Sequence, residues 1–267
     1  MPAGQRKETY TAGYSKAATT AMSLRSAERA AGFFLSHLKK GTSVLDCGCG
    51  PGTITQGLAT AVAPGKAVGI DLSEAQVAIA RDGALGNGVK NVEFRVGDVY
   101  EIPFPDGSFN AVFSHTVLEH LKRPDDAISE MLRVLKPGGV LGARSSNVSS
   151  YIFSPPSKYM SRWFECLRDK GKKNGGDLDF GIVQSGLFRR AGLQRVTTTT
   201  STFHLSGADW QKILSAPTKA VQEFLRSNGV PEEEVRPMLA GNRRWSRNPD
   251  AFGSAINTET VGWKPKR

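Results

Sequence analysis

A carboxylate followed by three glycines on alternate positions marks the stretch where ligand chemistry is most readily placed. Asp46 ends a short apolar run, and Gly48, Gly50 and Gly52 follow before a segment with helical spacing opens at Thr53. Glycine permits positive φ and removes the Cβ atoms that would hold a ligand away from the main chain. The first amides of the following helix lack partners inside it. We therefore predict a turn on whose backbone a nucleotide-type ligand lies.

The spacing of these glycines distinguishes between the ligands that bind to such turns. The dinucleotide fingerprint G-x-G-x-x-G requires glycine or alanine where Thr53 stands. A nicotinamide-dependent oxidoreductase also usually carries a Tyr-x-x-x-Lys pair, and no tyrosine of this sequence has lysine four residues later. The pattern therefore favours a cofactor other than a nicotinamide dinucleotide.

Polar side chains also stand at the ends of other predicted strands. Apolar strands that alternate with helical segments indicate a parallel sheet, in which ligands bind at the carboxyl ends of the strands. Asp71, Asp98 and the pair Ser114-His115 stand at such ends. Together with Asp46, four strands thus direct polar groups toward one crevice. Strands are expected at residues 44–46, 67–71, 92–96, 109–115, 140–145, 193–205 and 251–263, the last as a closing edge strand.

The connecting helices follow from apolar spacing and capping residues. A first helix should begin between Ser23 and Ser26 and close at Gly41. A capping box at Ser73 starts another, and Pro124 opens a third in its first turn. Further helical segments are expected at residues 54–62 and 178–191, whereas residues 151–173 mix prolines, aromatics and basic residues.

This order of elements predicts an α/β fold. We expect a Rossmann-like, doubly wound and mostly parallel seven-stranded sheet with a helical insertion before the last strand. Residues 1–23 are expected to form an N-terminal cap segment, and residues 24–206 with 248–267 the core. Residues 207–247 read as two or three amphipathic helices. Because aromatic side chains mark both the cap segment and this insertion, we expect the two to close over the crevice as a lid.

The glycine stretch resembles motif I of the class I S-adenosylmethionine-dependent methyltransferases, acidic-x-G-x-G-x-G, here Asp46 to Gly52. Residues 109–121 and 130–139 are similar to the branch that includes the ubiquinone and menaquinone C-methyltransferases, the methyltransferase type 11 branch. The resemblance covers residues 24–145. It implies an enzyme that takes a methyl group from S-adenosyl-L-methionine and releases S-adenosyl-L-homocysteine.

The resemblance also implies a role for each polar strand end. Asp71 would accept hydrogen bonds from both ribose hydroxyls, because an ionised carboxylate offers two acceptor oxygens. Asp98 would accept one from the adenine amino group, and Asp46 would favour the methionine ammonium. Leu72 and Val99 would sandwich the adenine ring. The other residues expected at the cofactor are Tyr14, Gly48, Cys49, Gly50, Gln76, Ser114 and His115.

Methyl transfer from this cofactor is an in-line displacement, which requires alignment and exclusion of water and no catalytic triad. Where the acceptor must lose a proton, a base assists, and histidine is the side chain that titrates near neutral pH. We therefore predict His115 and His120 as catalytic residues, with His204 as a further candidate. Cys47 and Cys49 are too close together, and cysteines too few, for a zinc site, so no metal is expected.

The net charge of +10 leaves several acceptors open, because it would attract nucleic acid as well as an anionic small molecule. The Asn/Asp-Pro-Pro-aromatic motif of amino-group methylases is absent after the fourth predicted strand, and a Pro-Cys nucleophile is absent altogether. We therefore expect a hydrophobic or anionic small-molecule acceptor and no specific nucleic acid. RNA or another macromolecule as acceptor, a nicotinamide-dependent oxidoreductase and a non-catalytic cofactor-binding protein stay as alternatives.

The sequence also indicates the cellular compartment of the protein. Its apolar runs are shorter than the ~18 residues of a membrane span, and its N-terminus lacks the apolar centre of a signal peptide. We therefore expect a cytoplasmic protein without a membrane span.

Overall fold

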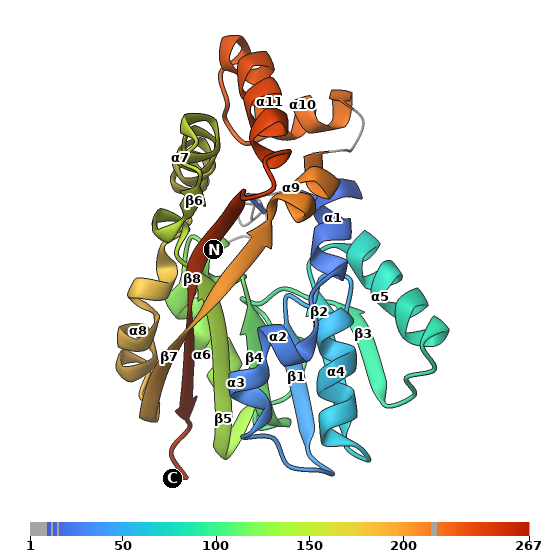
Figure 1. Ribbon diagram of the computed structural model, residues 1–267. Helices are drawn as coiled ribbons and strands as arrows, with labels where there is room; N and C mark the ends of the chain where they lie inside the picture. The colour runs from blue at the N-terminus through green and yellow to red at the C-terminus, as the bar shows by residue number, and fades with distance from the viewer. Residues whose placement is uncertain (1–9, 12, 15, 215–217, 267) are drawn as a thin grey trace, which may run out of the picture.

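An eight-stranded sheet runs through the molecule, and helices cover both of its faces (Figure 1). The computed structural model describes residues 10, 11, 13, 14, 16–214 and 218–266 of the 267-residue chain. The strand order is β3-β2-β1-β4-β5-β8, with β6 and β7 paired to β8. The strands are β1 (Ser43–Cys47), β2 (Lys66–Asp71), β3 (Val92–Val96), β4 (Phe109–His115), β5 (Leu135–Ser146), β6 (Ile152–Ser154), β7 (Gln194–Ser206) and β8 (Phe252–Trp263).

The first five strands are parallel, and helices connect most of them. These helices are α4 (Thr53–Val62), α5 (Glu74–Gly86) and α6 (Pro124–Val134). The chain crosses from β3 to β4 over β2 and β1, so the strand order reverses between β1 and β4, at a topological switch point. Ligands of open parallel sheets bind beside such a point. The predicted Rossmann-like, mostly parallel sheet is confirmed, with eight strands instead of seven.

The return strands differ from the prediction in two ways. β8, expected at the edge, lies inside the sheet between β5 and β7, where Thr260 is fully buried. The edge position belongs to β7, most of whose residues are exposed. The additional strand β6 has three residues and pairs with β8 beyond the end of β5. So short a strand gives no alternating pattern by which a sequence could predict it.

The single N-terminal helix predicted from residues 23–26 to Gly41 is wrong, because the N-terminal part of the chain forms three short helices, the first of which ends where the predicted helix was to begin. They are α1 (Lys16–Ser23), α2 (Ala27–Ala30) and α3 (Gly32–Leu35). Ala31 leaves the helical conformation with φ −129° and ψ 11°. This break turns α3 so that Phe34 packs against the sheet, 5.2 Å from the ring of Phe113. A Cβ on Gly142 would lie 2.3 Å from the Phe34 ring, so glycine makes this approach possible.

The sheet faces are covered by different helices. Helices α2 to α5 pack on one face through apolar residues such as Phe34 and Leu58, whereas α6 and α8 (Gln184–Arg190) pack on the other through Met131 and Phe188. No helix in the described part of the chain is long and apolar enough to cross a membrane.

Helices α7 and α9 to α11 gather at the end of the molecule toward which the parallel strands run (Figure 1). They are α7 (Lys158–Lys173), α9 (Gly207–Leu214), α10 (Thr218–Ser227) and α11 (Glu232–Ser246). Helix α7 lies in residues 151–173, for which no helix or strand was predicted. Its Trp163 packs with Trp210 of α9 and Met238 of α11 in a separate apolar cluster. The aromatic residues of the insertion are therefore buried against α7.

Candidate active site

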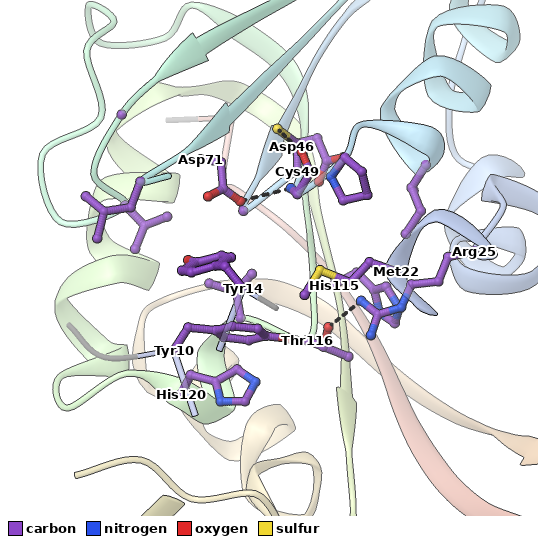
Figure 2. Close-up of a pocket in the computed structure, with 18 of the residues that line it drawn as sticks. Tyr10, Tyr14, Met22, Arg25, Asp46, Cys49, Asp71, His115, Thr116 and His120 are labelled. Carbon is purple, nitrogen blue, oxygen red and sulfur yellow. Dashed lines mark hydrogen bonds between the residues drawn. The ribbon is translucent and has the colours of Figure 1, made fainter. Parts of the chain in front are cut away.

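A cavity lies at the carboxyl ends of β1, β2, β3 and β4, beside the switch point (Figure 2). About 980 Å³ of space, part of it open to solvent, lies between the residues that line it. Most of the residues that the sequence places at a cofactor line it together. They are Tyr14, Asp46, Gly48, Cys49, Gly50, Asp71, Leu72, Asp98, Val99, His115 and, from the catalytic pair, His120.

The glycine turn forms one wall of the cavity. Gly48 and Gly52 have φ of 77° and 79°, in the left-handed region that favours glycine. A Cβ on Gly48 would lie 2.2 Å from Cγ2 of Val117. The amides of Gly48 and Cys49 both donate to the carbonyl of Ile70, at 2.8 and 2.9 Å, which ties the turn to the end of β2. The turn therefore requires glycine for its conformation and its packing alike.

Asp71 is held at the end of β2 by two backbone amides. Its Oδ2 accepts a hydrogen bond from Gly50 N–H at 2.9 Å, and its Oδ1 accepts one from Ser73 N–H at 2.9 Å. Burial raises the pKa of this carboxyl, while the two N–H groups act against that shift by favouring the ionised form. Each oxygen keeps a further lone pair. The carboxylate is thus fixed in orientation with acceptor capacity on the cavity side.

Asp46 lies deeper, with 2% of its surface exposed. Burial raises the pKa of Asp46 to about 7, although its Oδ2 accepts a hydrogen bond from Thr55 Oγ1 at 2.6 Å, which favours ionisation. A carboxyl in this state gains by pairing with a cation, because the cation stabilises the charge that burial opposes. Asp46 can therefore respond to a positively charged ligand group.

Asp98 completes the row of carboxylates. Its Oδ1 accepts a hydrogen bond from Tyr100 N–H at 2.9 Å, which fixes the turn after β3. Beside it, Val99 and the half-exposed Leu72 present apolar surface to the cavity. A planar ring can therefore lie between apolar side chains with a hydrogen-bond acceptor at its edge.

Both predicted catalytic histidines line the cavity, but in neutral form. Burial, aided by the nearby Arg25 guanidinium, holds the pKa of His115 well below its usual range and lowers that of His120 to about 3. Neither Nδ1 atom has a hydrogen-bond partner among the described residues. Each imidazole can accept a hydrogen bond, whereas full proton transfer to it is opposed. His204, the third candidate, lies exposed on β7, away from the cavity.

Several further residues line the cavity, and of these only Tyr10, in the cap segment expected to close over the crevice, was predicted. Tyr10, Met22, Arg25 and Thr116 reach the cavity from the N-terminal segment and from the turn after β4. Arg25 Nη1 donates to Thr116 Oγ1 at 3.1 Å (Figure 2). No motif marks these residues, because the breaks between α1, α2 and α3 decide where they lie. The pair Tyr10 and Tyr14 is the only sequence signal that this segment lies at a ligand site.

An aromatic row closes one side of the cavity. The rings of Tyr10 and Tyr14 lie 5.2 Å apart, and that of Tyr10 meets the His120 ring edge-on at 4.6 Å. Figure 2 shows Tyr14, Tyr10 and His120 following one another away from Asp71. The N-terminal segment thus contributes directly to the walls.

Two residues expected at the cofactor do not line the cavity. Gln76 is buried, and its Nε2 donates to Thr19 Oγ1 at 2.9 Å, which joins α5 to α1. Ser114 is buried at a position paired with Cys47 and Ala143, whose side chains belong to the core on the α6 side of the sheet. The one-residue alternation of a strand turns Ser114 away and His115 toward the cavity. None of the described residues of α9 to α11 lines it either.

Comparison with known proteins agrees with this geometry. A family model described as "Methyltransferase domain" matches residues 38–215. The probable methyltransferase ltbC of Aspergillus luteorubrus is 31% identical over 279 residues, covering 96% of this chain and 97% of that protein. The ubiquinone/menaquinone biosynthesis C-methyltransferase UbiE of Ectopseudomonas mendocina (strain ymp) is 39% identical over 109 residues, covering 40% of this chain and 43% of that protein.

A solved structure shows the same fold. Haemonchus contortus phosphoethanolamine N-methyltransferase 2, in complex with S-adenosyl-L-methionine, has a TM-score of 0.51 at 20% identity, covering 85% of this chain and 49% of that chain. The domain match and the full-length relative confirm the resemblance that motif I suggested. The chain therefore belongs to the family of S-adenosylmethionine-dependent methyltransferases.

Proposed function

We propose that the protein binds S-adenosylmethionine in this cavity and transfers its methyl group to a small-molecule acceptor by in-line displacement. The observation that carries the proposal is the row of Asp46, Asp71 and Asp98 at the ends of three neighbouring strands around one cavity. The cofactor offers an ammonium, a ribose diol and an adenine amino group, and each of these is a hydrogen-bond donor. Three acceptors in a row suit three donors.

The chain's own residues fit the cofactor group by group. Asp71 would accept the ribose hydroxyls on its free lone pairs, and Asp98 the adenine amino group, with Leu72 and Val99 against the ring. The ammonium would lie beside Asp46, where its charge favours the ionised carboxylate. The glycine turn lets the main chain approach this part of the ligand.

Arg25 would hold the methionine carboxylate. Its guanidinium lines the cavity, and none of the described carboxylates lies within ion-pair distance of it. Its hydrogen bond to Thr116 fixes one nitrogen and leaves further donors for a ligand. A charged pair of this kind orients the amino-acid end of the cofactor.

When bound, the cofactor supplies a methyl group on a positively charged sulfur. The protein has to align the acceptor and exclude water. Tyr10, Tyr14 and His120 form the wall that serves this purpose. Because protonation of His115 and His120 is opposed, we assign them hydrogen bonding that positions the acceptor, in preference to general-base catalysis.

A small acceptor, hydrophobic or anionic, is supported by the aromatic row and by the concave, partly open shape of the cavity. The test is incubation with methyl-labelled cofactor and a host metabolite extract, followed by mass spectrometry. We expect label in a small molecule, and much less label with Asp71→Ala. A parallel incubation with host RNA and protein tests the alternative acceptors, and label found only there would refute the small-molecule assignment.

A further inference from the structure

The edge strand β7 is uncovered along one side. All of its 13 residues are described, and from Thr197 to Ser206 each pairs with a residue of β8. No described strand pairs with its other side. Residues 197–200 and 202–204 are exposed, so side chains on both faces of the strand meet solvent. The free edge therefore presents a row of backbone donors and acceptors.

Beyond Arg195 and an irregularity at its start, the sequence of β7 contains none of the features that usually protect such an edge. Natural edge strands are short, carry lysine or proline, or are interrupted by bulges. Residues 196–206 contain no charged residue and no proline, although 22% of the chain is charged. The one irregularity in the pairing of β7 lies at its start, between Gln194 and Thr197. An unprotected edge of this length is a template for strand pairing.

We propose that β7 pairs antiparallel with β7 of a second copy of this chain, so that the two sheets become continuous across a twofold axis. A twofold axis makes the strands antiparallel and brings the same surface together from both copies. In a register centred on Thr200, Thr199 faces Ser201 of the other copy and Thr198 faces Thr202. The Thr198–Thr202 pairs are favourable, whereas the hydroxyls of Thr199 and Ser201 are already bound to Glu259 and Arg144 of their own chain.

The composition of the edge suits pairing with a second copy, because residues 196–206 of both chains would meet without bringing charged side chains of that segment together. Two chains of net charge +10 repel each other over most of their surfaces, but the uncharged edge offers a contact without that repulsion. Phe203 and Ile256, 38% and 43% exposed, lie on opposite faces of the β7–β8 pair and add apolar surface beside the edge.

The site stays free in such a dimer. The cavity is lined from the ends of β1 to β4, and β5 and β8 separate it from β7. Dimer formation and cofactor binding can therefore be measured independently, and failure of one does not imply failure of the other.

Sedimentation equilibrium of the full chain, with and without the double change Thr198→Lys and Thr200→Lys, tests the proposal. We expect a dimer for the unchanged chain and at least a tenfold weaker dimer for the variant. S-adenosylhomocysteine binding checks that the variant folds, and Leu85→Lys, on an exposed face of α5, is the matched control that keeps the dimer.

Cysteine cross-linking gives a second test. The three native cysteines are buried, so a new one at Thr200 can be followed alone. With oxidised glutathione as oxidant, Thr200→Cys should form a disulfide-linked dimer far faster than Leu85→Cys. A chain that sediments as a monomer at high concentration would overturn the proposal, as would a dimer unaffected by the lysines or equal cross-linking of the two cysteine variants.

Discussion

Asp71 at the end of β2 accepts a hydrogen bond from the backbone N–H of Gly50 at 2.9 Å, so the carboxylate and the glycine turn of the neighbouring strand hold each other in place. A single side chain thus links the two parts of the site that would contact the ribose and the methionine. Substitution of either residue should therefore weaken the contacts to both the ribose and the methionine.

Replacing Asp71 tests this link. Asp71→Ala should weaken S-adenosylhomocysteine binding by about 1.5–3 kcal/mol, the size of hydrogen bonds to a charged group. Asp71→Asn keeps an oxygen that can accept the hydrogen bond from the Gly50 amide, so this variant should lose less affinity for S-adenosylhomocysteine. Calorimetry measures both, with exposed Asp82→Ala on α5 as the control. Equal affinity in Asp71→Ala and the unchanged chain would remove Asp71 from the cofactor site.

The turn at Gly48 should not tolerate a side chain. Gly48→Ala places a Cβ 2.2 Å from Val117 at a φ of 77°, so overpacking and left-handed strain together should cost about 2–5 kcal/mol of unfolding free energy. Urea unfolding gives the value. In a Val117→Ala background, the share of this destabilisation that comes from overpacking should disappear, and the share that comes from left-handed backbone strain should remain. Gly32→Ala in α3, which has no neighbour within 4 Å, is the control and should be neutral or stabilising.

Cofactor affinity should depend on pH through Asp46. Burial raises the pKa of this carboxyl to about 7, and an ammonium pairs with its ionised form, so affinity should rise from about pH 6 to about pH 8. Without ligand, the folding stability depends on pH with the opposite sign. The folded state binds the proton more tightly, so stability from this group is present below the ordinary pKa of 3.8 and is lost as pH rises through 7.

Calorimetry in buffers of different ionisation enthalpy measures the proton released on S-adenosylhomocysteine binding. Asp46→Asn should bind more weakly and show a flat profile across the same range. A profile in the Asn variant that matches the unchanged chain would assign the titration to another group.

The proposed role of Arg25 can be tested by comparing ligands with and without the amino-acid end of the cofactor. Arg25→Met should weaken S-adenosylhomocysteine binding by about 1.5–3 kcal/mol, because a charged hydrogen bond to the carboxylate is lost. Methylthioadenosine lacks the amino-acid end, so its affinity should not change. If both ligands lose affinity equally, Arg25 acts on the fold of the cavity and not on the carboxylate.

Hydrogen exchange tests the lid. The N-terminal wall around Tyr10 and Tyr14 should gain protection when S-adenosylhomocysteine is added, because closure over a ligand excludes water. Protection of residues 207–247 would support the lid predicted for the insertion, and its absence would leave these helices as a unit packed on α7. A truncation that removes residues 1–20 should lower turnover strongly, and full activity after that truncation would exclude an N-terminal lid.

Much of the fold could be read from the sequence, because local signals decide it. The strands β3 and β4 and the start of α6 agree with apolar runs and with Pro124. Residues that depend on tertiary packing could not be read in this way. Arg25 lies in the non-helical stretch between α1 and α2, where tertiary packing brings it to the cavity, and Ser114 turns away because strand alternation places His115 at the cavity. Burial by surrounding elements likewise sets the neutral state of the histidines.

The most direct test of the account is a calorimetric titration of the full chain with S-adenosylhomocysteine and, separately, with NAD. The row of Asp46, Asp71 and Asp98 predicts micromolar binding of S-adenosylhomocysteine and no measurable binding of NAD. Tight binding of NAD, or no binding of S-adenosylhomocysteine, would contradict the cofactor assignment.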